Sequence, residues 1–178
     1  MTIFPVREKN IPLNIRNTNE PDHPGTLITE SFVEAPNPER FVTGIAGKCD
    51  FSIVTVSKKG LSGAVGTLRA ILEVFENNSI PVAHTPSGID CISLAMPTEA
   101  LTPNQYSLLD ELRSEIRPDS IQINDHIAVI AVVGRKMAFR VGTSGKIFAA
   151  LGKAGINIRM ISQGPDEQAI ILGVDNKD

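Results

Sequence analysis

The sequence has few aromatic residues, few cysteines and no excess of basic charge, and each scarcity excludes a class of function. There is no tryptophan and one tyrosine, Tyr106, and aromatic residues make up 4% of the 178 positions, too few for a surface that stacks nucleobases. Seventeen Lys and Arg against twenty Asp and Glu give a formal net charge of -3, so no basic field attracts nucleic acid or an anionic membrane. We therefore expect no nucleic-acid partner.

The spacing of the cysteines and histidines and the hydropathy of the chain also argue against disulfides, a metal site, a signal peptide and a membrane span. Cys49 and Cys91 form neither a disulfide framework nor a CxxC metal pattern. The start of the chain has no basic region before a long apolar stretch, and no apolar run approaches about 18 residues, so neither a signal peptide nor a membrane span is expected. The three histidines are scattered without partners at ligand spacing, so we expect no metal site. We therefore expect a cytoplasmic protein.

Residues 1–40 differ from the rest of the chain in their proline content, with six of the twelve prolines. Residues 11–16 are expected to form a short strand and residues 21–25 a turn. Because proline fixes φ and removes a backbone donor, this segment is not expected to build a stable sheet alone. We interpret it as a connector or as the end of a neighbouring domain, partly disordered or held by a neighbour.

Residues 41–123 carry the pattern of a β-α-β-β-α-β unit, the ferredoxin-like arrangement. β-branched residues indicate strands, and apolar residues at helical spacing, such as Leu68, Ile71, Leu72 and Phe75, indicate a helix. The expected strands are residues 51–56, 80–83, 92–96 and 121–123. The expected helices are residues 64–78 and a second one that starts at Thr102-Pro103, with Thr102 as N-cap, and ends before Pro118.

An internal repeat relates residues 124–178 to this unit. A gap-free shift of 76 residues matches Val65-Gly66-Thr67 with Val141-Gly142-Thr143, and Gly88 with Gly164. The same shift matches Asp90 with Asp166 and places Leu94 opposite Ile170. It predicts strands at residues 127–133, 156–161 and 169–174 and a helix at residues 144–154. The second copy stops at Asp178, without the helix and strand that would close it.

Each copy places a glycine-containing turn between its first strand and its first helix. Glycine has no Cβ and lets a ligand approach the backbone, and the free N–H groups at the helix start suit a carboxylate. A small amino acid fits this arrangement, with its ammonium group on carbonyls or an acidic side chain. Alternatively, Gly63, Gly66 and Gly142 only permit a tight connection between strand and helix.

No catalytic set stands out in the sequence. Gly134-Arg135-Lys136 lacks the spacing of a P-loop, and no Ser-His-Asp or Cys-His arrangement is apparent. Residues 134–140 share a glycine and a terminal Phe-Arg with the phosphate cradle of acylphosphatases, which are also ferredoxin-like. A small acyl-phosphate hydrolase that depends on Arg140 is therefore the enzyme alternative.

Three stretches follow one another in the order and spacing of a known family. The first comprises FPVR at residues 4–7, IPLNIRNT at 11–18 and PGTLI at 24–28; the second is HTPSGID at 84–90; the third comprises VVG at 132–134, GINIRMISQG at 155–164, and Glu167. In these stretches the chain resembles the C-terminal regulatory region of aspartokinase (aspartate kinase). The resemblance implies an α+β fold of two ferredoxin-like ACT domains, residues 41–123 and an incomplete one at 124–178. Residues 1–40 would be a linker at the end of a kinase domain.

The resemblance also implies a function: allosteric feedback control of aspartate phosphorylation in lysine, threonine and methionine biosynthesis. An amino-acid effector of the lysine or threonine class would bind at an interface of ACT domains in a homodimer. The kinase domain of the intact enzyme would hold ATP and Mg²⁺, so this chain is expected to carry no cofactor and to be inactive alone. It would be either an excised piece or a separate regulatory subunit.

The family's effector site can be carried onto this sequence residue by residue. It comprises the first turn and helix start, the second strand and two positions of the second copy: Gly60, Leu61, Ser62, Gly63, Ala64, Val65, Gly66, Thr67, Val82, Ala83, Pro86, Ser87, Asp90, Asn157 and Ile158. Ala83 stands where related sequences have an acidic residue, and residues 61–67 lack the glutamate of the related turn. Because buried ammonium groups need partners, we expect a smaller or less charged effector than lysine, or a weakened site. A ligand-free ACT scaffold that only joins kinase subunits is the remaining alternative.

Overall fold

The computed structural model describes residues 3–9, 11–29, 42–134, 137, 140–164 and 169–178, and the chain divides into two compact units, Met1–Arg40 and Phe41–Asp178. In the first unit, helix α1 (Ile3–Glu8) precedes an antiparallel pair of strands, β1 (Leu13–Ile15) and β2 (Thr26–Ile28). The strand expected at residues 11–16 is confirmed. The neighbouring prolines lie before and between the two strands, so they remove no donor from this short ladder.

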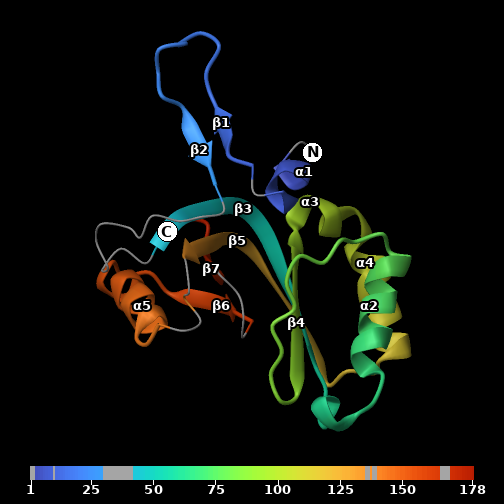
Figure 1. Ribbon diagram of the computed structural model, residues 1–178. Helices are drawn as coiled ribbons and strands as arrows, with labels where there is room; N and C mark the ends of the chain where they lie inside the picture. Colours follow the sequence, from blue (N-terminus) through green and yellow to red (C-terminus); the bar gives the residue numbers. More distant parts are fainter. Residues whose placement is uncertain (1–2, 10, 30–41, 135–136, 138–139, 165–168) are drawn as a thin grey trace. The chain divides into compact units, whose positions relative to one another are not determined.

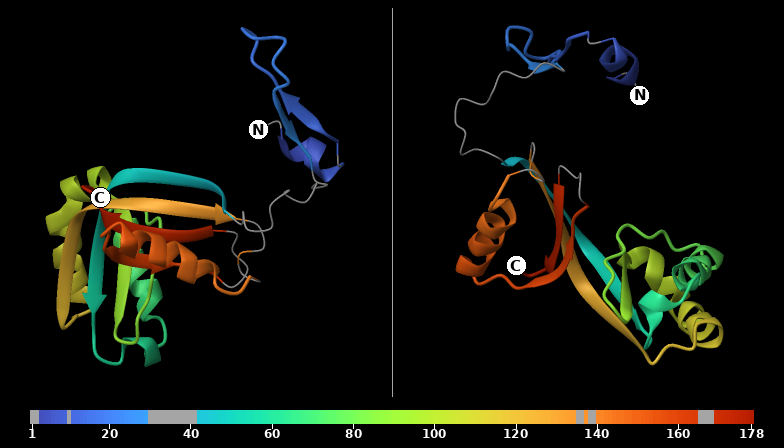
Figure 2. Two further views of the ribbon diagram at one scale, coloured as in Figure 1. Left: turned by 90° about the vertical axis from the view of Figure 1, so that its left-hand side faces the viewer. Right: turned by 60° about the horizontal axis from the view of Figure 1, so that its bottom comes forward.

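A five-stranded antiparallel sheet, in the order β4-β3-β5-β7-β6, forms the second unit (Figure 1). Two long strands, β3 (Val42–Ser57) and β5 (Ser120–Gly134), run side by side through it in every view (Figures 1 and 2). Strand β4 (Cys91–Pro97) flanks β3, while β7 (Ala169–Asp175) and then β6 (Ile158–Ser162) flank β5. This combination of helices and antiparallel strands confirms the α+β, ferredoxin-like class.

Helices pack at both ends of the long strands (Figure 1). A 3-10 turn, η1 (Leu61–Gly63), leads into α2 (Thr67–Asn77), and α3 (Thr98–Leu101) leads through η2 (Thr102–Asn104) into α4 (Gln105–Glu115). Helix α5 (Thr143–Lys153) belongs to the second copy and packs through Ile147 on β5 and β7. Thr102 is not the expected N-cap, because its hydroxyl donates to the carbonyl of Thr98 one turn earlier (2.8 Å). Among the described residues, no helix is long and apolar enough to cross a membrane.

Each long strand serves both copies of the repeat. Residues 51–57 of β3 pair with β4, and residues 53–57 pair with residues 120–124 of β5. Residues 42–48 of β3 pair instead with residues 129–134 of β5. The strands expected separately at residues 121–123 and 127–133 are therefore one strand. The position of the closing strand that the second copy lacks in sequence is occupied by the first half of β3.

Asp50 and His126 mark the points where β3 and β5 pass from one copy to the other. Both are non-glycine residues with positive φ, 62° and 61°, and the register of the β3–β5 pair shifts on both sides of Phe51. Asn176 joins them: its Nδ2 donates to Asp50 Oδ1 (2.8 Å) and its backbone N–H donates to the carbonyl of His126 (2.8 Å). Asp50 and His126 are 76 residues apart and are therefore equivalent positions of the repeat. Both copies thus have a positive φ at this position.

The shift of 76 residues reproduces the first helix of each copy but not the last strand. Helices α2 and α5 begin and end at equivalent residues. In the sheet, however, Leu94 pairs with Val54 and Leu172 pairs with Ile130, so Leu94 corresponds to Leu172. The match of Leu94 with Ile170 is wrong by two residues, because the connection before β7 is longer. Asp166 and Glu167 of that connection lie outside the described residues.

The strand expected at residues 80–83 does not form. Instead, residues 83–88 contact β4 through two bridges, His84 with Ala95 and Ser87 with Ile92, and through a few backbone hydrogen bonds, such as that from the Ser93 N–H to the Pro86 carbonyl (2.9 Å). Pro81 and Pro86 have no N–H to donate, so a continuous ladder is interrupted. Their equivalents in the second copy are Asn157 and Ser162, and there the chain forms the continuous strand β6.

A hydrophobic cluster joins the two copies. Phe51 and Ile53 of β3 and Ala95 of β4 pack with Ile127 of β5 and Met160 of β6. All five are less than 10% exposed. The second copy therefore shares both a strand and part of its core with the first.

A buried hydroxyl near this cluster yields a first stability prediction. Ser52 is fully buried; its Oγ donates to Asp125 Oδ1 (2.6 Å) and lies 2.9 Å from Thr98 Oγ1. Ser52→Ala should lower the free energy of unfolding by about 1–3 kcal/mol, because a carboxylate loses its donor. Urea denaturation measures the change. Ser114→Ala, which removes an exposed bond to the Glu111 carbonyl, should change it by less than about 0.5 kcal/mol; an equally small effect at Ser52 would contradict the expectation.

Candidate functional site

The turn between β3 and α2 is held by hydrogen bonds to two aspartates. The backbone N–H of Gly60 donates to Asp90 Oδ1 (2.8 Å), and that of Lys58 donates to the Asp90 carbonyl (2.9 Å). The N–H of Lys59 donates to Asp119 Oδ2 (2.7 Å). The carboxylate of Asp90, an expected effector contact, thus holds the glycine turn in place.

Helix α2 begins directly after this turn. Gly66 precedes the helix with φ 85°, and the hydroxyl of Thr67 donates to the carbonyl of Ala64 (3.2 Å). Within the described part of the chain, no side chain caps the helix, and its first turn has no acidic residue. The first N–H groups of a helix have no acceptor within it, so this end of α2 suits an anionic group.

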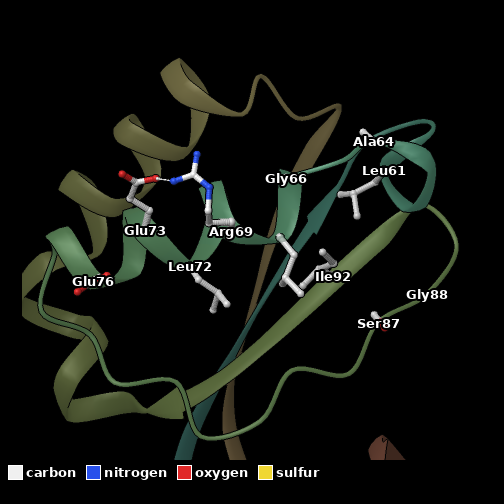
Figure 3. A pocket seen from close by; sticks show the side chains of 11 residues that line it. Leu61, Ala64, Gly66, Arg69, Leu72, Glu73, Glu76, Ser87, Gly88 and Ile92 are labelled. Atoms are coloured by element: carbon white, nitrogen blue, oxygen red, sulfur yellow. Dashed lines mark hydrogen bonds and ion pairs between the residues drawn. The ribbon is translucent and has the colours of Figure 1, made fainter.

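A cavity of about 810 Å³ opens between α2 and the segment before β4; we call it the turn cavity (Figure 3). It is lined by Leu61, Ala64, Gly66, Leu68, Arg69, Leu72, Glu73, Glu76, Ser87, Gly88 and Ile92. Figure 3 shows Leu61, Leu72 and Ile92 on the side of α2 that faces the 87–88 segment. Arg69 and Glu73 form an exposed ion pair (2.9 Å) along α2. The cavity thus combines apolar walls with charges at its margin.

The turn cavity brings together some of the expected effector residues and leaves others outside. Leu61, Ala64, Gly66 and Ser87 line it, whereas Gly60, Gly63, Val65 and Thr67 belong to the same turn and helix start without lining it. Val82 and Ala83 lie on the interrupted segment beside β4, and Pro86 lines a second cavity. Ile158 is the first residue of β6 in the second copy, and Asn157 immediately precedes it. The side chain of Ser62 is outside the described part.

Sequence reasoning missed the α2 face of the cavity. Leu68 and Leu72 are four residues apart on that helix, as are Arg69 and Glu73, and Glu76 follows one turn later. The spacing i, i+4 was the available signal, since it places the residues of each pair on one helix face. The helix contributes the charged groups that the turn itself lacks.

The backbone conformation at the helix start yields a second prediction. An added Cβ would meet no atom of the described residues within 4 Å at Gly66 or at Gly145 inside α5, but of these two glycines only Gly66 has a positive φ. Gly66→Ala should therefore lower the free energy of unfolding by about 1–2 kcal/mol, while Gly145→Ala should raise it by about 0.5–1 kcal/mol. Thermal unfolding of both variants measures the difference. Equal effects would show that the left-handed conformation at Gly66 is not required.

Two alternative chemistries are a metal site and the hydrolysis of an acyl phosphate that depends on Arg140. Among the described residues, no group of three His, Cys, Asp or Glu side chains could hold a metal ion. Residues 135, 136, 138 and 139 of the suggested phosphate cradle lie outside the described part, so the hypothesis about Arg140 stays untested.

Sequence comparisons agree with the fold. A family model of the ACT domain matches residues 130–178. Aspartokinase 3 of Bacillus subtilis is 30% identical over 173 residues, which cover 97% of this chain and 37% of that protein. The chain thus spans little more than a third of the length of this relative.

Two solved structures extend the agreement to the whole fold. The aspartate kinase of Clostridium acetobutylicum is 40% identical, with a TM-score of 0.90 over 99% of this chain and 40% of its own. A structure of aspartokinase alpha and beta subunits is 28% identical, with a TM-score of 0.64 over 76% of this chain and 89% of its own. On sequence and fold together, the chain belongs to the aspartokinase family and corresponds to its ACT-domain regulatory region.

Proposed function

We propose that this chain is the amino-acid-binding, allosteric part of an aspartate kinase, through which an end product controls aspartate phosphorylation in lysine, threonine and methionine biosynthesis. The turn cavity beside the start of α2 is the observation that carries the proposal. The aspartate kinase of Clostridium acetobutylicum, which shares this fold, is an allosteric enzyme. The intact protein would act in the cytoplasm, with ATP and Mg²⁺ on its kinase domain.

The composition of the cavity suggests how an amino acid would lie in it. The N–H groups at the start of α2 suit the carboxylate, and Leu61, Leu72 and Ile92 provide walls for the apolar part of a side chain. Glu73 and Glu76 place two carboxylates on the same lining. Because these acidic groups come from the helix, lysine and threonine both remain candidates even though the turn lacks its usual glutamate.

Exposed apolar residues around the cavity suggest that a second copy completes it. Val65 is fully exposed, Ile89 is 80% exposed and Leu68 is 47% exposed. The interrupted segment beside β4 also leaves an incompletely paired sheet edge. A homodimer with twofold symmetry would cover both features. The same surface supports the alternative, in which ACT domains join kinase subunits without binding an effector.

Thermal unfolding against a panel of amino acids separates these two functions. At a hundred times its dissociation constant, a ligand that binds only the folded state stabilises it by about 2.7 kcal/mol. We expect one L-amino acid among lysine, threonine, methionine and aspartate to raise the melting temperature, and its D-enantiomer to leave it unchanged. A folded dimer with no selective stabiliser would favour the scaffold.

A further inference from the structure

The pairing of β3 with β5 contains two bulges, one in each strand. Lys48 pairs with Val129. The next pair, Phe51 with Ile127, lies three residues further along β3 but only two along β5. From there to the following pair, β3 advances by two residues and β5 by three. The extra residue in one strand therefore compensates for the extra residue in the other, and the ladder has the same register on both sides.

These compensating bulges lie at the boundary between the two copies; we call residues 49–52 of β3 and 125–128 of β5 the elbow. A bulge bends its strand and increases the local twist. The left view of Figure 2 shows that both strands change direction between the copies. Because the register is the same on both sides, a regular ladder without bulges would give both halves the same partners. The bend is therefore not a requirement of the pairing.

The elbow holds two residues in a rare backbone conformation. Asp50 and His126 have φ values of 62° and 61°, in the left-handed region that residues with a Cβ rarely adopt. Such a conformation persists where neighbouring contacts hold it. Phe51 and Ile127, which directly follow these two residues, are both less than 10% exposed. Each bend therefore lies immediately before a buried position.

Asn176, directly after β7, is hydrogen-bonded to both bends. Its Nδ2 donates to Asp50 Oδ1 (2.8 Å), and its Oδ1 accepts from the Asp50 N–H (3.3 Å). Its own N–H donates to the carbonyl of His126 (2.8 Å). One residue of the second copy thus holds the backbone of both strands at the elbow.

The packing around the elbow allows a change of angle. Phe51 and Ile127 pack with Ala95 of β4 and Met160 of β6. Methionine is unbranched and has three rotatable side-chain bonds, so it adapts to a changing gap. The main apolar clusters of the two copies share no residue with this joint cluster. Each copy can therefore keep its own core while the joint rearranges.

We propose that the elbow is a hinge between the two copies and that Asn176 is the positioning residue that latches it at the observed angle. When the latch is broken, the copies change their relative orientation while each keeps its own ladder and core. Hinges commonly consist of a few residues that absorb changes in φ and ψ. The hinge belongs to the chain itself and does not depend on the effector proposed for the turn cavity.

Residual dipolar couplings of the backbone amides in the whole chain test this role, because they report the orientation of each copy in a common frame. In the unmodified chain, the couplings of α2, α4 and β4 and those of α5, β6 and β7 should fit one alignment tensor. In Asn176→Ala, each group should still fit a tensor of its own, but the two tensors should differ in orientation or magnitude. Asp50→Asn should keep one tensor, because asparagine tolerates the left-handed conformation and its Oδ1 can accept from Asn176.

Asn104→Ala is the matched control. Asn104 is also half-buried, and its Nδ2 donates to the carbonyl of Asn78 within the first copy (3.1 Å). The control should lower the melting temperature by a few degrees, as Asn176→Ala should, but it should keep one tensor. Should Asn176→Ala fail to fold, Asp50→Ala takes its place, because it removes the acceptor of the same side-chain bond.

Two outcomes would overturn the hinge and its latch. One is a single tensor, equal to that of the unmodified chain, in Asn176→Ala or in its replacement. The other is a pair of different tensors in Asn104→Ala as well, since any lost hydrogen bond would then loosen the chain and Asn176 would have no particular role.

Discussion

Replacing Phe75 by alanine should lower the free energy of unfolding by about 3–5 kcal/mol, the usual cost of removing a buried aromatic side chain. Phe75 lies on α2, is 1% exposed and belongs to a cluster with Val54 of β3, Leu94 of β4 and Leu112 of α4. The same ring therefore contributes to the contact of α2 with both the sheet and the neighbouring helix. Urea denaturation monitored by circular dichroism measures the loss.

Two variants calibrate this prediction. Leu68→Ala lies on the same helix at a position 47% exposed, so it should cost less than about 1 kcal/mol. Phe75→Leu keeps most of the apolar volume and should fall between the two. If Phe75→Ala unfolded at the same urea concentration as the unmodified chain, the packing of α2 on the sheet would be contradicted.

The fragment of residues 124–178 should not fold alone. It would lose the pairing of residues 42–48 with β5, and its Ile127 and Met160 would lose Phe51, Ile53 and Ala95 as partners. An exposed strand edge and half of a shared core leave too little apolar burial to offset the conformational entropy of about 55 residues. Circular dichroism and amide chemical-shift dispersion would detect the unfolded state.

The control for this prediction is the fragment of residues 42–178, which keeps the shared strand and the joint cluster. It belongs to one compact unit and should unfold cooperatively. Cooperative unfolding of residues 124–178 alone would mean that the second copy is an independent domain, and that the continuity of β3 and β5 contributes little to its stability.

The repeat and its helices could be predicted from sequence because they depend on local signals. Apolar spacing and the glycine before each helix indicated α2 and α5, and the shift of 76 residues related them. The continuity of β3 and β5 left no such signal. It depends on positive φ at Asp50 and His126, which are not glycines, and on Asn176, which is far from Asp50 in sequence.

Prolines explain the main error in the expected strands. Residues 80–83 have the apolar and β-branched character of a strand, but Pro81 and Pro86 remove two donors, and the segment contacts β4 through two bridges and a few backbone hydrogen bonds without forming a strand. Strand propensity measures side-chain preference and does not count lost backbone donors. The second copy, with Asn157 and Ser162 at these positions, shows the strand that the pattern predicts.

Only part of the candidate site could be predicted from the sequence. The family resemblance pointed to the turn at residues 60–67, and Leu61, Ala64 and Gly66 do line the turn cavity. The opposite wall is formed by α2, and its charged residues look in sequence like an ordinary solvated helix face. Only the fold reveals that Glu73 and Glu76 lie on the same cavity as the turn.

A crystal structure of the chain with the amino acid that stabilises it would test the central claim most directly. The account predicts ordered density in the turn cavity, with the carboxylate at the start of α2 and the side chain between Leu72 and Ile92. Density for that amino acid at another site, with the turn cavity empty, would contradict it.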